Sequence, residues 1–204
     1  MPKRKASSSS TRTRSPAATS SGQLKPTPQQ LEAARAKTLR DVIGPDLKVL
    51  FCGINPGLYS AATGNHFARP GNRFWPALHA GGFTPRRFWP WEKDLFLQLG
   101  YGLTNLVGRA TASADELDAA ELVKGRRRLQ RKVQRYRPRI VAFLGMGAYR
   151  FAFATPKAAL GEQPMRFEGA RVWVLPSPSG LNANYQMGAL VALLRELHTA
   201  ATRA

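Results

Sequence analysis

Short runs of consecutive apolar residues predict the strands of a buried sheet. Three such runs cover residues 48–51, 140–144 and 171–175, and a weaker one covers 102–106. Runs of this length that are rich in Val, Ile, Leu and Phe, without polar alternation, are typical of strands buried on both faces. We therefore expect a central sheet that is covered on both sides.

Helical patterns lie between the predicted strands. Apolar residues recur at helical spacing in six segments, which are 28–40, 72–79, 92–99, 114–136, 146–153 and 184–197. Strands that alternate with helices form parallel sheets with helices on both faces. The pattern thus predicts an α/β fold, in which ligands bind beyond the carboxyl ends of the strands.

Small residues directly follow three of the four predicted strands. The first strand leads into Gly-Ile-Asn-Pro-Gly-Leu at 53–58, the third into Gly-Met-Gly at 145–147, and the fourth into Pro-Ser-Pro-Ser-Gly-Leu at 176–181. Each segment taken alone is an ordinary turn. Because the carboxyl ends of parallel strands meet at one edge, the three loops together predict a groove there.

The chain carries a large excess of positive charge. Its 204 residues include 31 Lys and Arg against 12 Asp and Glu, a formal net charge of +19. This balance indicates a polyanionic partner, of which nucleic acid is the commonest soluble kind. The densest basic cluster falls near the end of segment 114–136, where a solvated helix face is a slightly better interpretation than direct phosphate contact.

Residues 1–40 form a basic arm in this interpretation, and residues 41–204 form a single domain. The arm holds nine basic residues and one acid, and up to about residue 27 it is rich in Ser, Thr and Pro. That part is expected to be disordered, because it has too little apolar surface to offset the entropy of ordering. It is equally well interpreted as a solubilising leader and as a tether that binds phosphates.

The single cysteine, Cys52, excludes several kinds of site. One thiol cannot build a disulfide framework, a Cys₄ zinc site or a cysteine-ligated iron–sulfur cluster. The sequence contains neither a run of about 18 apolar residues nor a secretory pattern, so we expect no membrane span and no export. We expect a monomer without metal or cofactor, in the cytoplasm of a bacterium or the nucleus of a eukaryote.

Three longer motifs stand in order along the chain. The first is Val-Leu-Phe-Cys-Gly-Ile-Asn-Pro-Gly-Leu at 49–58. The second runs from Thr-Gly at 63–64 through Phe-Ala-Arg-Pro-Gly-Asn-Arg-Phe-Trp at 67–75, and the third is Leu-Pro-Ser-Pro-Ser-Gly-Leu at 175–181. Together they resemble the mismatch-specific uracil/thymine-DNA glycosylases over residues 46–198. The resemblance implies a three-layer α/β/α sandwich with a short, mainly parallel sheet, and cofactor-free removal of a flipped base.

The resemblance also implies roles for individual residues of the first two motifs. Asn55 would orient the attacking water through its amide oxygen, and Phe67 would stack on the flipped pyrimidine. Backbone groups of Ile54 and Phe67 would read the edge of the base. Ser60 would lie near its C5 position, where the methyl group of thymine must fit.

The third motif is similar to the wedge loop of that family. Leu181, presented by Gly180, would fill the gap that the extruded nucleotide leaves. Ser177 is expected to bind substrate; it stands where the bacterial branch often has asparagine, and serine is compatible with the thymine-processing branch. Ala183 stands where an arginine could assist the wedge.

Three polar residues outside these assignments have open or minor roles. Asp94 is a secondary catalytic candidate, because a carboxylate could activate water more strongly than an amide; a surface helix position is the commoner interpretation. Asn105 replaces a lysine of the family after the second strand. His66 precedes Phe67 and is expected at the surface.

We therefore expect a monofunctional DNA glycosylase of base-excision repair. It would act on double-stranded DNA and remove uracil from G·U-type mismatches, with thymine and modified cytosine as further candidate bases. The alternative is a nucleic-acid-binding module that keeps the fold and has lost catalysis. A glycosylase type with aspartate in the first motif is disfavoured by Asn55, and a nucleotide-binding enzyme by the lack of a Gly-rich phosphate motif.

Overall fold

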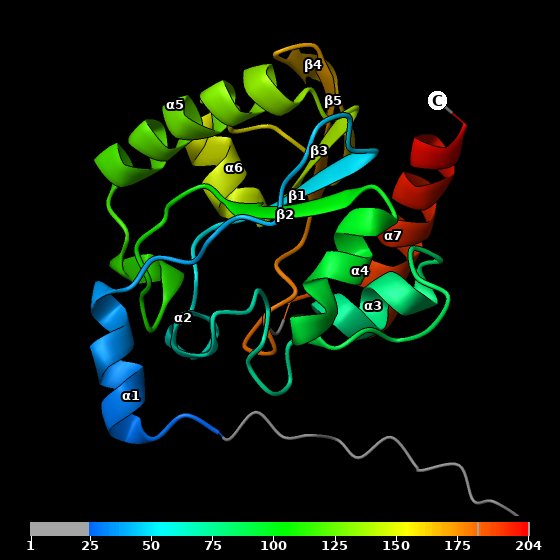
Figure 1. Cartoon of the computed structure of the whole chain (residues 1–204). Coiled ribbons are helices and arrows are strands. Elements are labelled where there is room, and N and C mark those ends of the chain that lie inside the picture. The colour runs from blue at the N-terminus through cyan, green and yellow to red at the C-terminus, as the bar shows by residue number, and fades with distance from the viewer. Residues whose placement is uncertain (1–24, 183, 204) are drawn as a thin grey trace, which may run out of the picture.

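A five-stranded sheet forms the centre of the molecule (Figure 1). The structure is a computed structural model that describes residues 25–182 and 184–203. The sheet has the order β2-β1-β3-β5-β4, and all pairs are parallel except that of β4 with β5. The strands are β1 (Val49–Gly53), β2 (Tyr101–Asn105), β3 (Ile140–Leu144), β4 (Gly161–Phe167) and β5 (Ala170–Leu175).

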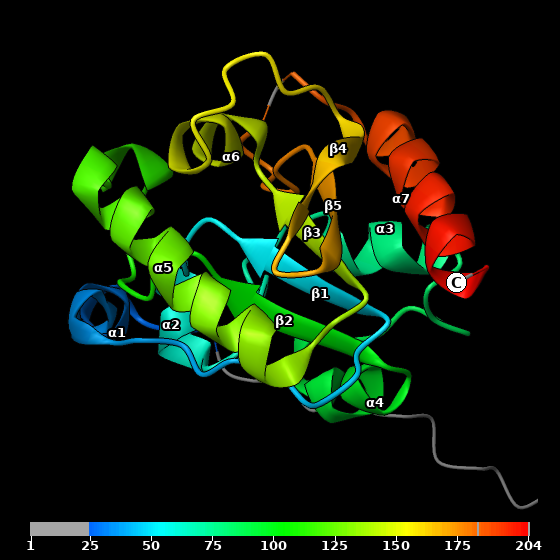
Figure 2. The ribbon, with the colours of Figure 1, turned by 90° about the horizontal axis from the view of Figure 1, so that it is seen from above.

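Helices cover both faces of the sheet (Figure 2). One layer contains α3 (Phe74–Ala80), α4 (Lys93–Gln98) and α7 (Met187–Thr202), and the other contains α5 (Ala119–Tyr136) and α6 (Met146–Ala152). This arrangement confirms the predicted α/β/α sandwich. Within the described ranges, no helix combines the length and the apolar character that crossing a bilayer requires.

Alternate residues of the central strands face the two cores. In β1, Val49 and Phe51 pack on the side of α3, α4 and α7, whereas Leu50 and Cys52 pack on the side of α5 and α6. All five residues of this strand are buried. Burial on both faces explains why the sequence shows a continuous apolar run rather than alternation.

Two elements differ from the expectation. The helix expected over 114–136 is divided into a short 3-10 helix (Ala114–Glu116) and α5, because Asp118 caps α5 by accepting a hydrogen bond from the Glu121 amide at 2.7 Å. Strand β4 was not expected, because its sequence mixes glycine, proline and polar residues. Such a strand is tolerated at the edge of a sheet, where Pro164 need not donate to a neighbour.

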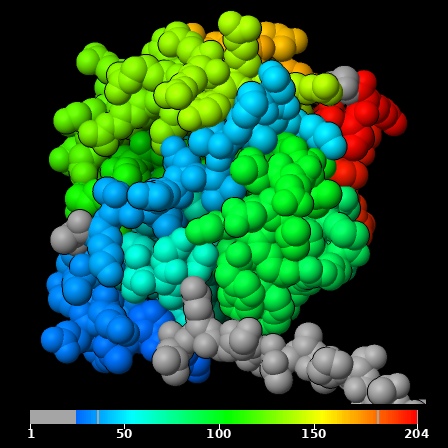
Figure 3. All heavy atoms as spheres, viewed as in Figure 1, coloured from blue at the N-terminus to red at the C-terminus, as the bar shows by residue number. Residues whose placement is uncertain are grey.

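Residues 28–40 pack against the body of the protein. Helix α1 (Pro28–Ala33) begins at a cap formed by Thr27. It contacts helix α2 (Leu58–Thr63), and the sequence pattern had not predicted a helix at α2. Ala34, in the turn after α1, is fully buried in a small apolar cluster. The segment that follows runs along the surface of the body (Figure 3). Packing thus begins before residue 41, whereas residues 1–24 lie outside the described part.

Candidate active site

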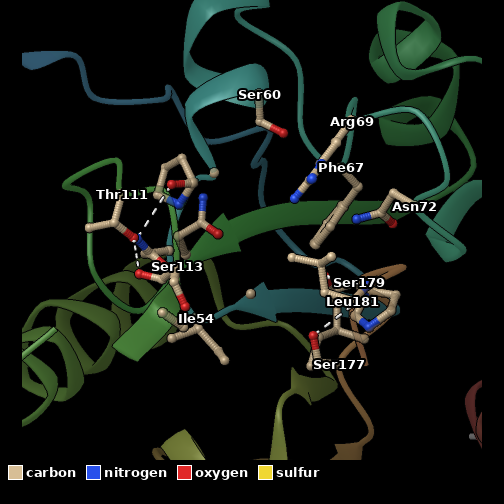
Figure 4. A pocket seen from close by; sticks show the side chains of 18 of the residues that line it. Ile54, Ser60, Phe67, Arg69, Asn72, Thr111, Ser113, Ser177, Ser179 and Leu181 are labelled. Carbon is tan, nitrogen blue, oxygen red and sulfur yellow. Dashed lines mark hydrogen bonds between the residues drawn. The ribbon is translucent and has the colours of Figure 1, made fainter. Parts of the chain in front are cut away.

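A cavity of about 390 Å³ opens at the carboxyl ends of the central strands (Figure 4). The last residues of β1, β2 and β3, which are Gly53, Asn105 and Leu144, lie side by side in the sheet and line its floor. The volume lies within the usual range of small-ligand sites, roughly 300–1,000 Å³. It brings together most of the residues expected from the motifs, namely Ile54, Asn55, Ser60, Phe67, Ser177 and Leu181.

Asn55 is held in a single orientation by its surroundings. Its Nδ2 donates hydrogen bonds to the Thr111 hydroxyl oxygen at 2.6 Å and to the Arg109 carbonyl at 3.0 Å. Since the Thr111 hydroxyl donates its own proton to the Ser113 carbonyl at 2.6 Å, it can only accept from Asn55. No hydrogen bond to the Asn55 amide oxygen comes from the described residues. This oxygen is therefore available to a water or a ligand.

Phe67 forms an apolar wall of the cavity. Its ring stacks on Phe74 with the ring centroids 4.1 Å apart. Its backbone is left-handed, with a φ of 54°, which is costly for a residue with a side chain and is found where the surroundings fix it. Ser60 lies nearby and is buried, with its hydroxyl accepting a hydrogen bond from the Ala68 amide at 3.2 Å. This side of the site is thus built before any ligand arrives.

Asn105 presents an amide inside the cavity without a partner from the protein. The residue is buried, and no hydrogen bond to its side chain occurs in the described part of the chain. A Cβ on Gly53 would lie 2.6 Å from the Asn105 Oδ1 and 3.4 Å from the Phe67 ring. The glycine therefore keeps open the space between the amide and the ring. An amide placed there can donate to and accept from the edge of a flat ligand.

Hydrogen bonds from Arg73 hold the backbone of the loop that carries Leu181. The Arg73 guanidinium donates to the carbonyls of Ser179 and Asn182, at 2.6 and 2.9 Å, and also to that of Tyr185. Leu181 itself remains 69% exposed, the largest exposed fraction among the large hydrophobic residues of the described part. Figure 4 shows Phe67, Asn72 and Leu181 on one side of the cavity and Thr111 and Ser113 on the other.

Gly180 does not line the cavity. It allows the loop that carries Leu181 to lie close to the backbone of the second motif. A Cβ at this position would lie 2.7 Å from the Gly71 carbonyl oxygen. The backbone of the loop can therefore lie against residue 71 only because residue 180 has no side chain. Ala183, the position where an arginine could assist the wedge, lies outside the described residues.

His66 is buried, which contradicts the expectation of a surface position. Only 2% of the residue is exposed, and its Nε2 lies 2.9 Å from the Arg40 carbonyl. Because a carbonyl only accepts, Nε2 carries the proton in this contact. Burial lowers the pKa of the imidazole to about 4, so the ring is neutral near pH 7. The sequence pattern did not indicate this, because the carbonyl that contacts the ring comes from Arg40, which is distant in the sequence.

The sequence of residues 40–198 matches the family model of the Uracil DNA glycosylase superfamily. The chain belongs to this superfamily. Its fold is similar to the solution NMR structure of "a putative Uracil DNA glycosylase from Methanosarcina acetivorans", with a TM-score of 0.52 and 18% sequence identity. The similarity covers 79% of this chain and 98% of the other, and at this identity it shows the fold alone. Membership supports a glycosylase-type function on DNA.

The acidic residues of this uracil DNA glycosylase superfamily member are distributed differently from the expectation. Asp94 is exposed on α4 and does not line the cavity. Asp115 does line it, and its carboxylate accepts a hydrogen bond from the Ser113 hydroxyl at 3.1 Å. Asp115 was missed because the pattern placed it in the first turn of a long helix. Its exposed carboxylate contributes negative charge to the rim of the cavity.

Neither a reactive cysteine nor a cluster of metal-binding side chains occurs among the described residues of the superfamily domain. Cys52 is buried, and desolvation raises the pKa of its thiol to about 12, which disfavours the reactive thiolate. Groups of three or more His, Cys, Asp or Glu side chains that could hold a metal ion do not occur among residues 25–182 and 184–203. The polar groups that line the cavity are amides, hydroxyls, backbone groups, the exposed Asp115 carboxylate, the Arg69 side chain and the neutral His66 ring.

Proposed function

We propose that the protein is a monofunctional DNA glycosylase that removes uracil from G·U-type mismatches in double-stranded DNA. Thymine and modified cytosine are further candidate bases, and the protein would act as a monomer. The observation that carries the proposal is the fixed amide of Asn55, whose oxygen is free to bind water. Thr111, which holds this amide, lies across the cavity from Phe67, which forms its apolar wall (Figure 4).

In this mechanism, the flipped base stacks on Phe67 while Asn55 orients a water toward the sugar carbon. Stacking of a base on an aromatic ring contributes about 1–3 kcal/mol. The bond between the sugar carbon and the base nitrogen breaks, and the base leaves as an anion to whose oxygen the Asn105 amide can donate a hydrogen bond. The water oxygen bonds to the sugar carbon, and the proton that it releases passes to solvent. Because an amide does not accept a full proton near neutral pH, we expect slow turnover.

The exposed side chain of Leu181 supplies the second requirement, which is to hold the duplex open. An apolar side chain that enters the stack replaces part of the stacking that the extruded base gives up. Arg73 keeps the loop in shape for this insertion. The exposed arginines of α5, among them Arg127 and Arg131, add to the positive field that attracts DNA.

A base-release assay on the full-length protein tests this function. Duplexes with G·U, A·U or G·T and single-stranded DNA with uracil are incubated with the protein, and one half of each sample is then treated with alkali. We expect strand breaks at G·U only after alkali, because a monofunctional enzyme leaves an intact abasic strand.

Two variants make the assay decisive. Asn55→Ala should lose base release, whereas Asp94→Asn, which alters a carboxylate outside the cavity, should retain it. DNA binding by the wild type without any base release would instead support the binding module that has lost catalysis. Undiminished release by Asn55→Ala would assign the water to another group, with Asp115 next to test.

A further inference from the structure

A second cavity, of about 200 Å³, adjoins the active-site cavity. The two share Phe67, Arg69 and Asn72, so they lie along the same segment of the second motif. The segment 87–91 forms the outer wall of the second cavity. We name the second cavity the aromatic groove. Its volume is below the usual size of a small-molecule site and suits one aromatic ring system.

Two tryptophans of the aromatic groove are exposed. Trp89 and Trp91 stack with an interplanar angle of 2° and ring centroids 5.2 Å apart, and 46% and 40% of these residues remain accessible. The other two tryptophans, Trp75 and Trp173, are buried. A pair of parallel indoles at the surface leaves an aromatic face free for a further ring.

A set of charged contacts holds this tryptophan pair in place. Arg86 donates to both carboxylate oxygens of Glu92, at 3.0 and 2.5 Å, and the same carboxylate accepts a hydrogen bond from the Trp89 amide at 2.8 Å. The Arg86 guanidinium also lies 4.9 Å from the centre of the buried Phe88 ring. The exposed rings are thus presented by an ordered loop, which lowers the entropic cost of binding to them.

Two arginines beside the rings remain available to an anion. The Arg87 guanidinium lies 5.4 Å from the centre of the Trp89 ring, and Arg69 stands at the junction of the two cavities. Both are exposed, and the salt bridges of the described residues involve neither. Aromatic faces together with unpaired arginines are typical of surfaces that bind single-stranded nucleic acid.

We propose that the aromatic groove binds one unpaired nucleotide of a DNA strand that continues into the active-site cavity. The base stacks on the tryptophan pair, and the adjoining phosphate pairs with Arg69 and Arg87. A base inside a duplex offers no free face, so the groove selects unpaired nucleotides. The inference rests on the proposed function in one respect, namely that DNA is the partner. It goes beyond that function because it gives the protein an affinity for single strands that base removal does not require.

Intrinsic tryptophan fluorescence tests this binding directly. The full-length protein is titrated with a uracil-free oligothymidylate of about ten nucleotides and, separately, with a blunt, fully paired duplex. We expect the single strand to quench the emission, because stacking involves the two exposed tryptophans, and the duplex to quench it much less. A wild-type emission that the single strand leaves unchanged would overturn the proposal without any variant.

Variants then assign the effect to the groove. A Trp89→Ala, Trp91→Ala double variant should lose the quenching and bind the oligonucleotide about 5- to 100-fold more weakly, the loss expected for one stacked base. Phe151→Ala removes an aromatic ring of similar exposure, 52%, from α6 and should bind as the wild type does. Arg87→Ala, which keeps both tryptophans, should lower the salt dependence of binding. Unchanged affinity in the double variant or in Arg87→Ala would contradict the proposal.

The outcome is separable from that of the proposed function. If the wild type releases uracil from G·U duplexes but binds no single strand, the proposal for the aromatic groove is contradicted and the proposed function is not. Binding and quenching without any base release would support the groove and contradict the proposed function. Circular dichroism of each variant shows whether a lost affinity reflects a lost fold.

Discussion

The two sides of the active-site cavity are held in different ways. On one side, the Asn55 amide is fixed by hydrogen bonds to Thr111 and to the Arg109 carbonyl, and Thr111 is itself buried. On the other side, Leu181 stands 69% exposed on a loop that Arg73 braces from beneath. The first side thus presents a polar amide fixed by hydrogen bonds, and the second presents an apolar side chain that is exposed to solvent.

Under the proposed function, this difference assigns the chemical step to the first side and the opening of the duplex to the second. In the proposed mechanism, the fixed amide orients the reacting water, which every substrate needs once its base is in the cavity. In the same mechanism, the exposed leucine fills the gap in the base stack, and such a gap arises only when the flipped base leaves a duplex. Substitutions on the first side should therefore act alike on all substrates, whereas substitutions on the second should act in proportion to how well the target base is paired.

The largest effect is expected from Asn55→Ala. Removal of the amide abolishes the orientation of the water, and base release from G·U duplexes should fall by about 10²-fold or more. Binding of the duplex should remain nearly intact, because the basic residues that we expect to attract the DNA backbone are unchanged. Single-turnover base release together with fluorescence anisotropy of the bound duplex measures the two quantities. Weaker binding with an unchanged rate would place Asn55 in substrate recognition instead.

A smaller, substrate-dependent effect is expected from Leu181→Ala. The shortened side chain no longer refills the stack, which should slow release from A·U roughly 10- to 100-fold, given a cost of a few kcal/mol for unstacking. The effect on G·U should be smaller, because a mismatch costs less to open. Phe151→Ala, at another exposed apolar position, should leave both rates unchanged. A loss of soluble, folded protein in Leu181→Ala would show that this side chain packs in the core.

Thr111→Val tests the side of the cavity that holds Asn55. The substitution keeps the shape of the buried residue and removes one hydrogen bond that fixes the amide, a loss of about 1 kcal/mol. Release should fall about fivefold, by the same factor for A·U, G·U and single-stranded uracil. Rates on the three substrates measure this. A decrease confined to the paired substrates would contradict the assignment of Thr111 to the water-orienting side.

The smallest effect concerns stability in mild acid. The pKa of His66 is lowered to about 4 by burial, below its ordinary 6.5, so between these values the unfolded chain binds a proton that the folded chain does not. The contribution of His66 is complete above pH 6.5 and is lost progressively toward pH 4. At pH 5 the free energy of unfolding should be about 2 kcal/mol lower than at pH 7 on this account.

Urea unfolding of the wild type and of His66→Gln at the two pH values checks this prediction. The glutamine amide can donate to the Arg40 carbonyl and does not titrate, so its variant should lose less stability than the wild type between pH 7 and 5. Equal losses in the two proteins would show that His66 does not titrate in this range.

The sequence predicted the sheet core and most of the cavity because both depend on local signals. Continuous apolar runs identified β1, β3 and β5, and the small residues after β1 and β5 identified the loops that carry Asn55 and Leu181. Parallel strands then bring these loops to one edge. No long-range contact had to be known for that step.

The residues that were missed or misplaced depend on contacts between distant segments. Thr111 acts on Asn55, which lies 56 positions earlier, and Arg73 braces carbonyls more than 100 positions later. His66 is covered by the segment that the charge pattern had assigned to the arm. Asp94 faces solvent because α4 presents Phe96, not the carboxylate, to the core. None of these relations leaves a periodic signal in the chain.

In the proposed function, Asn55 serves the chemical step and Leu181 serves the opening of the duplex. The most direct test is single-turnover uracil release from A·U duplex and from single-stranded DNA by the wild type, Asn55→Ala and Leu181→Ala. The ratio of the two rates should be the same in Asn55→Ala as in the wild type and roughly 10-fold or more lower in Leu181→Ala. A ratio that falls in Asn55→Ala, or that stays constant in Leu181→Ala, would contradict this division of roles.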